Sequence, residues 1–359
     1  MPNYQYSSLR KFTIDILTKI GHSEKHANTA ADVLLSADLR GVDSHGVARL
    51  SGYVRLWEKK RINAQPNIKI TRERLTTAVV DADESLGLIS GPFAMQLAIE
   101  KAKKTGSAWV AVNNSNHFGI AGFHAMMALE NNMIGFAFTN ASPLVAPTFG
   151  IERLLGTNPI AVAIPAGEEP PFVLDMATTT AANGKLEILN RKNLDAPEGW
   201  IQDKVGNPST KTDETKKGGA LLPLGSDREH GSHKGYGLGA MVDIFSGVLS
   251  GANFGPWVPP FVSFLEPSEN PVGKGLGHFF GAISIDGFME VEDFKAKMDV
   301  WIKTFKNSKS IENHQVIIPG EPERLFEAER KVKGIPLHEK VVEDLSNLGE
   351  KLGVKFPQM

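Results

Sequence analysis

The residues best suited to chemistry lie between positions 41 and 53, where the sequence reads Gly-Val-Asp-Ser-His-Gly-Val-Ala-Arg-Leu-Ser-Gly-Tyr. If this stretch is helical, His45, Arg49 and Tyr53 fall at i, i+4 and i+8 and line one face, about 6 Å apart per step. Histidine readily gives or takes a proton near neutral pH. The planar fork of arginine suits a carboxylate better than the point charge of lysine. The pattern therefore favours reduction of 2-oxo acids or oxidation of 2-hydroxy acids.

A purely structural explanation of the same residues stays open. A surface helix could carry His45 as a capping residue and Arg49 as a solvated cation. Gly46 costs such a helix about 1 kcal/mol relative to alanine. This cost favours a close approach by another group at Gly46, although it does not decide between the two explanations.

Composition narrows the classes of function. The chain has 359 residues, of which 41% are hydrophobic and 22% are charged, and its formal net charge is −2. This balance gives no basic footprint for nucleic acid and no polybasic patch for a membrane surface. Cysteine is absent, which excludes disulfides, thiolate metal sites and a cysteine nucleophile. With no apolar leader segment and no run of 18 apolar residues, we expect a cytoplasmic protein that acts on a small molecule.

Apolar periodicity predicts helical chain ends around a strand-rich middle. One of the early helices is expected to carry residues 45–57, and residues 191–232 are expected to form a long loop or mobile excursion. Strands are predicted at 68–70, 77–82, 108–112, 134–139, 156–165, 171–176 and 277–285, and further helices at 87–104, 178–190, 240–249, 291–305 and 338–353. We therefore expect a helical domain from residues 1–75 and 315–359, and a second domain from residues 76–314.

Polar turns after predicted strands supply further candidates, because ligands in α/β folds bind off strand ends beside helix N-termini. His117 follows such a strand among Asn113, Asn114 and Asn116, and its position fits a functional or a structural role equally. Asp175 either caps the next helix or holds a nucleotide together with nearby backbone amides. Asn140 and Ser142 could hydrogen-bond a carboxamide or a substrate.

Glycine-rich motifs give weaker signals. The Gly-x-Gly-x-x-Gly fingerprint of the usual dinucleotide fold is missing. The segments Gly235–Gly239 and Gly273–Gly277 are the nearest matches, and ordinary turns or close helix packing explain them as well. Lys234 stands just ahead of a predicted helix N-terminus, where it could help to bind a phosphate or could simply be solvated. The metal motifs His-Glu-x-x-His and the EF-hand loop are missing, as is the hydrolase motif Gly-x-Ser-x-Gly, so we expect no bound metal.

Taken together, these segments resemble the malate/L-lactate dehydrogenase family that lacks a Rossmann domain, whose members also act on ureidoglycolate, sulfolactate, diketogulonate and cyclic imine acids. The resemblance extends over nearly the whole chain. It rests on the segments at 40–50, 116–122, 156–159, 174–178, 233–238 and 334–337. It implies a three-layer α/β fold with a mixed, non-Rossmann NAD(P)-binding sheet and a homodimer.

The resemblance also implies roles for individual residues. His45 and His117 become the candidate proton donor and acceptor pair, and Arg49, supported by Ser44 and Tyr53, becomes the carboxylate site. For NAD or NADP, the matching positions are Ser142, Thr157, Asn158, Asp175, Met176, Ala177, Thr178, Lys234, Gly235, Gly320 and Glu321. The segments 191–232 and 253–276 are where the match is weakest and where substrate choice could be affected.

The expected function is hydride transfer between NAD(P)H and a small 2-oxo or 2-hydroxy acid, with malate and oxaloacetate as the first choice. In reduction, a protonated histidine would donate to the carbonyl oxygen while Arg49 holds the carboxylate. Another reaction of the same family is one rival, and a non-catalytic NAD(P)-binding protein is another. A metallohydrolase is a remote third.

Overall fold

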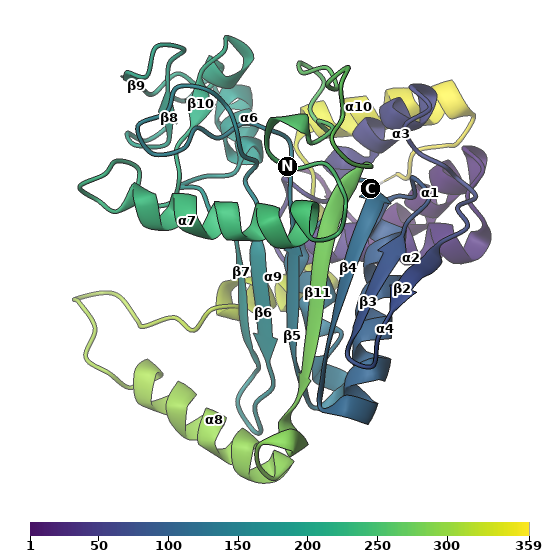
Figure 1. The fold of residues 1–359 in the computed structure, drawn as a ribbon. Helices are drawn as coiled ribbons and strands as arrows, with labels where there is room; N and C mark the ends of the chain where they lie inside the picture. The colour runs from purple at the N-terminus through teal and green to yellow at the C-terminus, as the bar shows by residue number, and fades with distance from the viewer. Residues whose placement is uncertain (359) are drawn as a thin grey trace.

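The centre of the protein is a seven-stranded mixed sheet in the order β2-β3-β4-β11-β5-β6-β7, as described by a computed structural model covering residues 1–358 (Figure 1). β3 and β4 run parallel, and every other neighbouring pair is antiparallel. The strands are β2 Lys69–Glu73, β3 Thr77–Asp81, β4 Ser107–Ser115, β5 Met133–Thr139, β6 Ile160–Ile164, β7 Phe172–Met176 and β11 Leu276–Ser284. The mixed sheet confirms the predicted fold class.

Helices α4 (Gly87–Thr105) and α5 (Ala121–Met126) cover one face of this sheet. Along β4, Val110 and Val112 point to the core beneath α4, because successive side chains of a strand alternate between faces. This core is built largely from alanine, valine and phenylalanine. The small side chains let α4 and α5 pack closely on the sheet and so fix the loop that joins β4 to α5.

The other face of the sheet carries an apolar trough of about 1050 Å³. Its floor is formed by the alternate strand residues, including Trp109, Phe136 and Phe279. Helix α7 (Ser232–Asp243) and the π-helical turn Ile244–Val248 border it, and Figure 1 shows α7 crossing this face of the sheet. The sheet is therefore covered by packed helices on one face and left partly open on the other.

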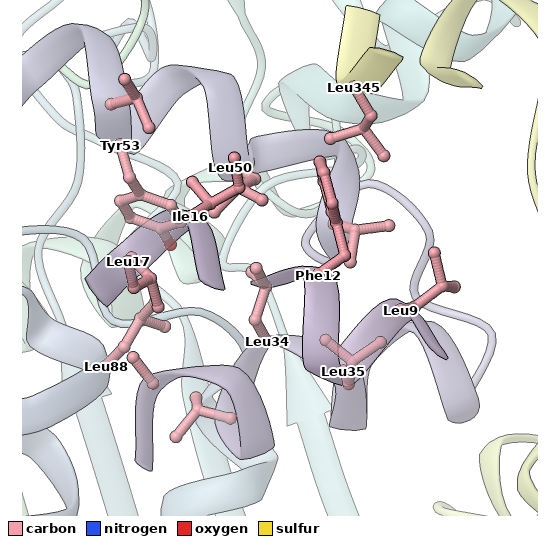
Figure 2. Close-up of a cluster of buried hydrophobic side chains, with 14 of the residues drawn as sticks. Leu9, Phe12, Ile16, Leu17, Leu34, Leu35, Leu50, Tyr53, Leu88 and Leu345 are labelled. Carbon is pink, nitrogen blue, oxygen red and sulfur yellow. The ribbon is translucent and has the colours of Figure 1, made fainter. Parts of the chain in front are cut away.

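The two chain ends meet in a helical region beside the sheet. β1 (Asn3–Tyr4) pairs with β12 (Ile335–Pro336), and α1 contacts α10. The helices here are α1 Tyr6–Lys19, α2 Glu24–Leu39, α3 Leu50–Glu58, α9 Glu321–Lys333 and α10 Glu339–Leu352. Their shared core includes fully buried Leu9, Ile16 and Leu34, with Leu345 contributed by the other end of the chain (Figure 2). The division into two domains stays a prediction, and β2, from the first segment, belongs to the large sheet.

Two further helices complete the chain, α6 (Asn183–Arg191) and α8 (Val291–Lys306). Helix α6 begins five residues later than predicted for residues 178–190. The shorter 3-10 turns are Val47–Arg49, Leu129–Asn131, Glu214–Lys216, Gly255–Trp257 and Ile285–Gly287.

The expected loop at 191–232 is instead a small folded lobe. Strands β8 (Ile201–Gln202), β9 (Pro208–Ser209) and β10 (Ala220–Leu221) form an antiparallel sheet in the order β10-β8-β9. Ile201 and Leu221 are fully buried against the loop at 144–155. The prediction was wrong because each strand has only two residues, too few to produce an apolar pattern, and tertiary contacts hold them.

The expected helix from His45 to Trp57 is also wrong at its start. A 3-10 turn begins at Val47 and α3 begins at Leu50, so His45 lies in the preceding loop. The carboxylate of Asp38 accepts a hydrogen bond from the backbone N–H of Val47 at 2.8 Å and caps the turn. A Cβ on Gly46 would lie 2.0 Å from that carboxylate. Asp38 is thus the group whose close approach requires glycine at position 46.

Candidate active site

Two histidine rings from distant parts of the chain face each other. His45 comes from the loop between α2 and α3, and His117 comes from the turn between β4 and α5. Their ring centroids are 5.7 Å apart and their planes are inclined by 23°. Both rings and Arg49 line one cavity of about 70 Å³. The structure therefore brings together the three residues that the sequence singled out for acid–base and carboxylate chemistry.

Hydrogen bonds fix the ring of His117. The hydroxyl of Tyr53 lies 2.7 Å from Nδ1, and the backbone N–H of Gly119 donates to the same nitrogen at 3.3 Å. Nδ1 accepts both bonds when the ring proton is on Nε2. In the other tautomer Nδ1 donates to the hydroxyl of Tyr53, which leaves Nε2 free to accept a proton. Tyr53 is fully buried in the helical core and therefore holds this contact rigidly. Tyr53, which the sequence predicted as a support for Arg49, thus also contacts His117.

Both histidines are kept neutral at neutral pH. Burial lowers the pKa of His45 to about 3, and the charge of Arg49 adds to the effect. Burial also places the pKa of His117 well below its usual value, with further contributions from His45 and Arg49. Ser44 Oγ hydrogen-bonds Nδ1 of His45 at 2.8 Å. In the free protein the pair is consequently ready to accept a proton, and it must take one up before it can donate.

Arg49 is held in place from two sides. Its Nε donates to the backbone carbonyl of Ser44 at 2.6 Å, and its Nη2 lies 3.0 Å from the carboxylate of Glu187 on α6. Helix α6 reaches Arg49 because residue 184 is glycine, where a Cβ would lie 2.9 Å from Nη2. The ring of Phe261 lies 5.9 Å from the guanidinium and 4.8 Å from the His117 ring. The guanidinium thus has a defined orientation at the cavity wall.

Two of the predicted cofactor residues share the cavity of the histidines. Ser142 and Thr157 both line it. The hydroxyl of Ser142 accepts a hydrogen bond from the backbone N–H of Phe261 at 2.8 Å, so it also positions that ring. Asn158 is fully buried behind them, where its side chain bonds the backbones of Ala141 and Gly239.

Asp175 is not an N-cap for the next helix, because α6 begins at Asn183 and has Ala182 as its N-cap. Instead its carboxylate accepts a hydrogen bond from the backbone N–H of Gly122, in the first turn of α5, at 2.8 Å. Asp175 is exposed as a residue, but partial desolvation of its carboxylate by the surrounding protein raises the pKa to about 6. Met176 and Ala177 follow, half-buried, and Thr178 bonds back to the carbonyl of Thr157.

The remaining predicted cofactor residues lie outside the histidine cavity. Lys234 and Gly235 are in the first turn of α7, which begins eight residues earlier than the helix predicted at 240–249, and Gly235 packs against the backbone of Leu224. Gly320 has a φ of 92° and contacts Val173 at the edge strand β7. Glu321 pairs with Lys306 at 3.0 Å. None of these four residues lines the cavity of His45 and His117.

Sequence reasoning missed three residues at the site, namely Phe261, Glu187 and Asn183. Phe261 stands in the irregular segment that follows Pro259 and Pro260, and only tertiary packing brings it between His117 and Arg49. Glu187 and Asn183 occupy ordinary positions on α6, where nothing in the local sequence separates them from solvated residues. Their role becomes visible once α6 is seen against Arg49.

Comparison with known proteins identifies the family. A model of the malate/L-lactate dehydrogenase family matches residues 4–346. Malate dehydrogenase from Pyrococcus horikoshii is 47% identical over 97% of this chain and 94% of that protein. Malate/(S)-sulfolactate dehydrogenase from Methanothermus fervidus is 40% identical over 97% of both chains. The crystal structure of malate dehydrogenase from Entamoeba histolytica superposes with a TM-score of 0.92 and 35% identity, over 99% of each chain.

The chain therefore belongs to the malate/L-lactate dehydrogenase family and is a hydroxy acid dehydrogenase. Membership implies a nicotinamide cofactor. Within residues 1–358, no helix is long and apolar enough to cross a membrane. The same residues contain no group of three or more His, Asp or Glu side chains arranged to hold a metal ion.

Proposed function

We propose that this enzyme interconverts malate and oxaloacetate, with a nicotinamide dinucleotide as hydride carrier. The names of similar proteins support malate as substrate, since the relatives from Pyrococcus horikoshii and Entamoeba histolytica are both malate dehydrogenases. The observation that carries the proposal is the meeting of His45, His117 and Arg49 on one cavity. Two proton carriers and one bidentate cation are the groups that this reaction needs from the protein.

In this proposal Arg49 binds the carboxylate next to the reacting carbon, and Ser44 and Tyr53 complete the substrate site. The carbonyl of Ser44 orients the guanidinium through Nε. Tyr53 orients the ring of His117, and its hydroxyl can donate or accept as the ring changes its protonation. The side chains around the acid are thus held in place before the acid binds, which lowers the entropic cost of reaching the reactive geometry.

We assign the proton transfer at the substrate oxygen to His117, with His45 beside it. The contacts from Tyr53 and Gly119 occupy Nδ1 of His117 and leave Nε2 to face a ligand. In oxidation the neutral ring, with its own proton on Nδ1 and donated to the hydroxyl of Tyr53, takes the substrate's hydroxyl proton at Nε2. In reduction it must first gain a proton, against the effect of its burial.

The residues present fit a nicotinamide dinucleotide in two places. The hydroxyls of Ser142 and Thr157 lie at the histidine cavity and suit a carboxamide, whereas Lys234 at the N-terminus of α7 suits a phosphate. A nicotinamide held there supplies the hydride. The cavity of about 70 Å³ admits only part of such a ligand, since ligand pockets usually span about 300–1,000 Å³. The rest would lie toward α7 and β7.

Further cofactor contacts are proposed for the residues that flank these two places. They are Asp175, Met176, Ala177, Thr178, Gly235, Gly320 and Glu321, and Asn158, which is fully buried, would act through the backbone of Ala141 and Gly239 that it holds. A direct contact from the carboxylate of Glu321 requires its ion pair with Lys306 to open. NAD and NADP are distinguished by measuring turnover with each.

We also propose that the enzyme is a homodimer whose subunits cover the apolar trough of the sheet. An open apolar surface bordered by exposed aliphatic side chains suits an interface between two copies of the chain. Val248 and Leu249 at its rim are 51% and 58% exposed. A second copy with the same surface would bury both.

An assay of NADH and NADPH oxidation with a panel of acids tests the proposed function. The panel contains oxaloacetate, pyruvate, 3-sulfopyruvate and a cyclic imine acid. We expect the largest kcat/KM with oxaloacetate. A larger value with another acid would reassign the substrate within the family. Binding of the dinucleotide without turnover of any acid would contradict the assignment of catalysis.

A further inference from the structure

Glu187 occupies the part of Arg49 that a substrate carboxylate would use. Its Oε2 lies 3.0 Å from Nη2, and its Oε1 lies 3.4 Å from Nη1, so the carboxylate spans the two terminal nitrogens of the guanidinium. The third nitrogen, Nε, is engaged by the carbonyl of Ser44. Bidentate pairing of this kind is the geometry in which arginine binds carboxylates best. The enzyme thus holds a carboxylate of its own on the arginine proposed to bind the acid.

The contact is built into helix α6. The amide of Asn183 donates to Oε1 of Glu187 at 3.0 Å, and the carbonyl oxygen of that amide accepts from Thr215 at 3.3 Å. Gly184 lets the same helix lie against Ser44 and Arg49. The side chains of Arg49 and Glu187 retain 17% and 27% exposure, so the ion pair is partly buried but open to exchange from one side.

Arg49 and α6 separate two cavities. The inner cavity contains His45 and His117, and Asn183 and Gly184 form part of its wall. The outer cavity, of about 410 Å³, opens on the other side of Arg49 and is lined by Glu187. Its positively charged side chains are Arg49, Arg55, Arg191, Lys216 and Lys340, against the two carboxylates Glu187 and Asp344. This excess of positive charge attracts anions toward Arg49.

We propose that Glu187 is a gate residue that the substrate's carboxylate displaces from Arg49. Binding of a 2-oxo acid is then an exchange of one carboxylate for another, and Glu187 sets the affinity for the acid. The inference rests on the proposed function, because it takes Arg49 as the carboxylate site. The apparent dissociation constant equals the intrinsic constant divided by the fraction of molecules in which Arg49 is free. Weakening the internal pair therefore tightens binding of the acid.

A positioning role for Glu187 makes the opposite prediction. If Glu187 only held Arg49 in its productive orientation, then removing the carboxylate would weaken binding of the acid. The sign of the change in KM thus separates a gate from a support. The variant Asp344→Asn controls for a general effect of removing negative charge. Asp344 lines the same outer cavity, but it accepts its hydrogen bond from Ser51 at 2.6 Å.

The test compares the full-length variants Glu187→Gln and Asp344→Asn with the unmodified enzyme. We expect Glu187→Gln to lower the KM for the 2-oxo acid and the inhibition constant of oxalate by about tenfold, as for an ion pair that leaves Arg49 free in about one molecule in ten. We expect kcat to change much less, and Asp344→Asn to change either constant less than twofold. A higher KM in Glu187→Gln, or equal shifts in both variants, would overturn the proposal.

Calorimetric titration with oxalate in the presence of the dinucleotide keeps this test independent of turnover. If the enzyme reduces none of the acids, the proposed function fails. The titration still shows whether the carboxylate of oxalate replaces Glu187 on Arg49. Tighter oxalate binding to Glu187→Gln and Glu187→Ala supports the gate. Equal or weaker binding to both contradicts it.

Discussion

The two most distinct hollows of this protein differ in almost every property. The trough on the sheet is large, about 1050 Å³, and its walls are aromatic and aliphatic. The cavity at the histidines is about 70 Å³ and brings together two imidazoles, a guanidinium and two hydroxyls. Size and apolar character therefore mark the surface proposed for a second subunit. Converging polar groups with shifted pKa values mark the candidate site of chemistry.

The largest expected effect concerns Arg49 in the small cavity. Arg49→Ala removes two charge-assisted hydrogen bonds to the acid, each worth about 1.5–3 kcal/mol, so we expect kcat/KM to fall about 10²–10⁴-fold. Steady-state kinetics with oxaloacetate measures the loss. Arg74→Ala, a change at an exposed position just after β2, serves as control and should alter kcat/KM only slightly. Unchanged turnover in Arg49→Ala would remove the carboxylate site.

The second prediction concerns the trough. Leu249→Glu places a charge on its exposed rim, and we expect the dimer to dissociate about 30-fold or more readily, because burying a leucine contributes about 1.5–3 kcal/mol and a buried charge costs more. Sedimentation velocity over a range of concentrations measures the change. Val332→Glu, which alters an exposed residue of α9, should leave the association intact. A monomeric unmodified enzyme would refute the proposed dimer.

The third prediction concerns the pH dependence of the histidine pair. Oxidation of malate needs a neutral ring, and the pKa values of both rings lie below 6.5 in the free enzyme. We therefore expect kcat/KM for oxidation to show no acid limb at the usual histidine pKa of about 6.5. Reduction needs the charged ring, so its kcat/KM should rise about tenfold for each unit by which the pH falls. An acid limb near pH 6.5 in the oxidation profile would show that the pair is not desolvated.

The smallest effect is expected for Tyr53. Tyr53→Phe keeps the buried ring and removes the hydroxyl that contacts His117 at 2.7 Å. A typical hydrogen bond contributes about 0.5–1.5 kcal/mol, so we expect kcat to fall about 2- to 10-fold with little change in KM. Stopped-flow or steady-state rates with malate provide the measurement. A raised KM at constant kcat would instead place the hydroxyl at the substrate's carboxylate.

The same contrast explains what could be predicted from the sequence. The large sheet was predictable because its strands are long enough to show apolar runs, and Ser44, His45 and Arg49 are conspicuous because they stand together. The start of α3 could not be predicted, because it depends on Asp38 of the preceding helix accepting a hydrogen bond from Val47. The family resemblance supplied the pairing of His45 with His117, 72 positions apart, which local patterns alone do not give.

Other parts of the site have no local signature at all. Phe261 enters between His117 and Arg49 from an irregular segment, and the backbone bond to Ser142 that places it joins residues more than a hundred positions apart. Glu187 lies on a helix of ordinary composition, within the stretch 178–190 that the sequence predicted as helical, but nothing in that stretch indicated a contact with Arg49. Both residues depend on how the lobe at 191–232 and the segment at 253–276 pack against the sheet.

A crystal structure of the enzyme with NADH and oxalate would test the central claim most directly. The account predicts one oxalate carboxylate on the guanidinium of Arg49, Glu187 displaced from it, and Nε2 of His117 within hydrogen-bonding distance of the acid. Oxalate bound away from Arg49, or both imidazole rings turned away from the ligand, would contradict the account.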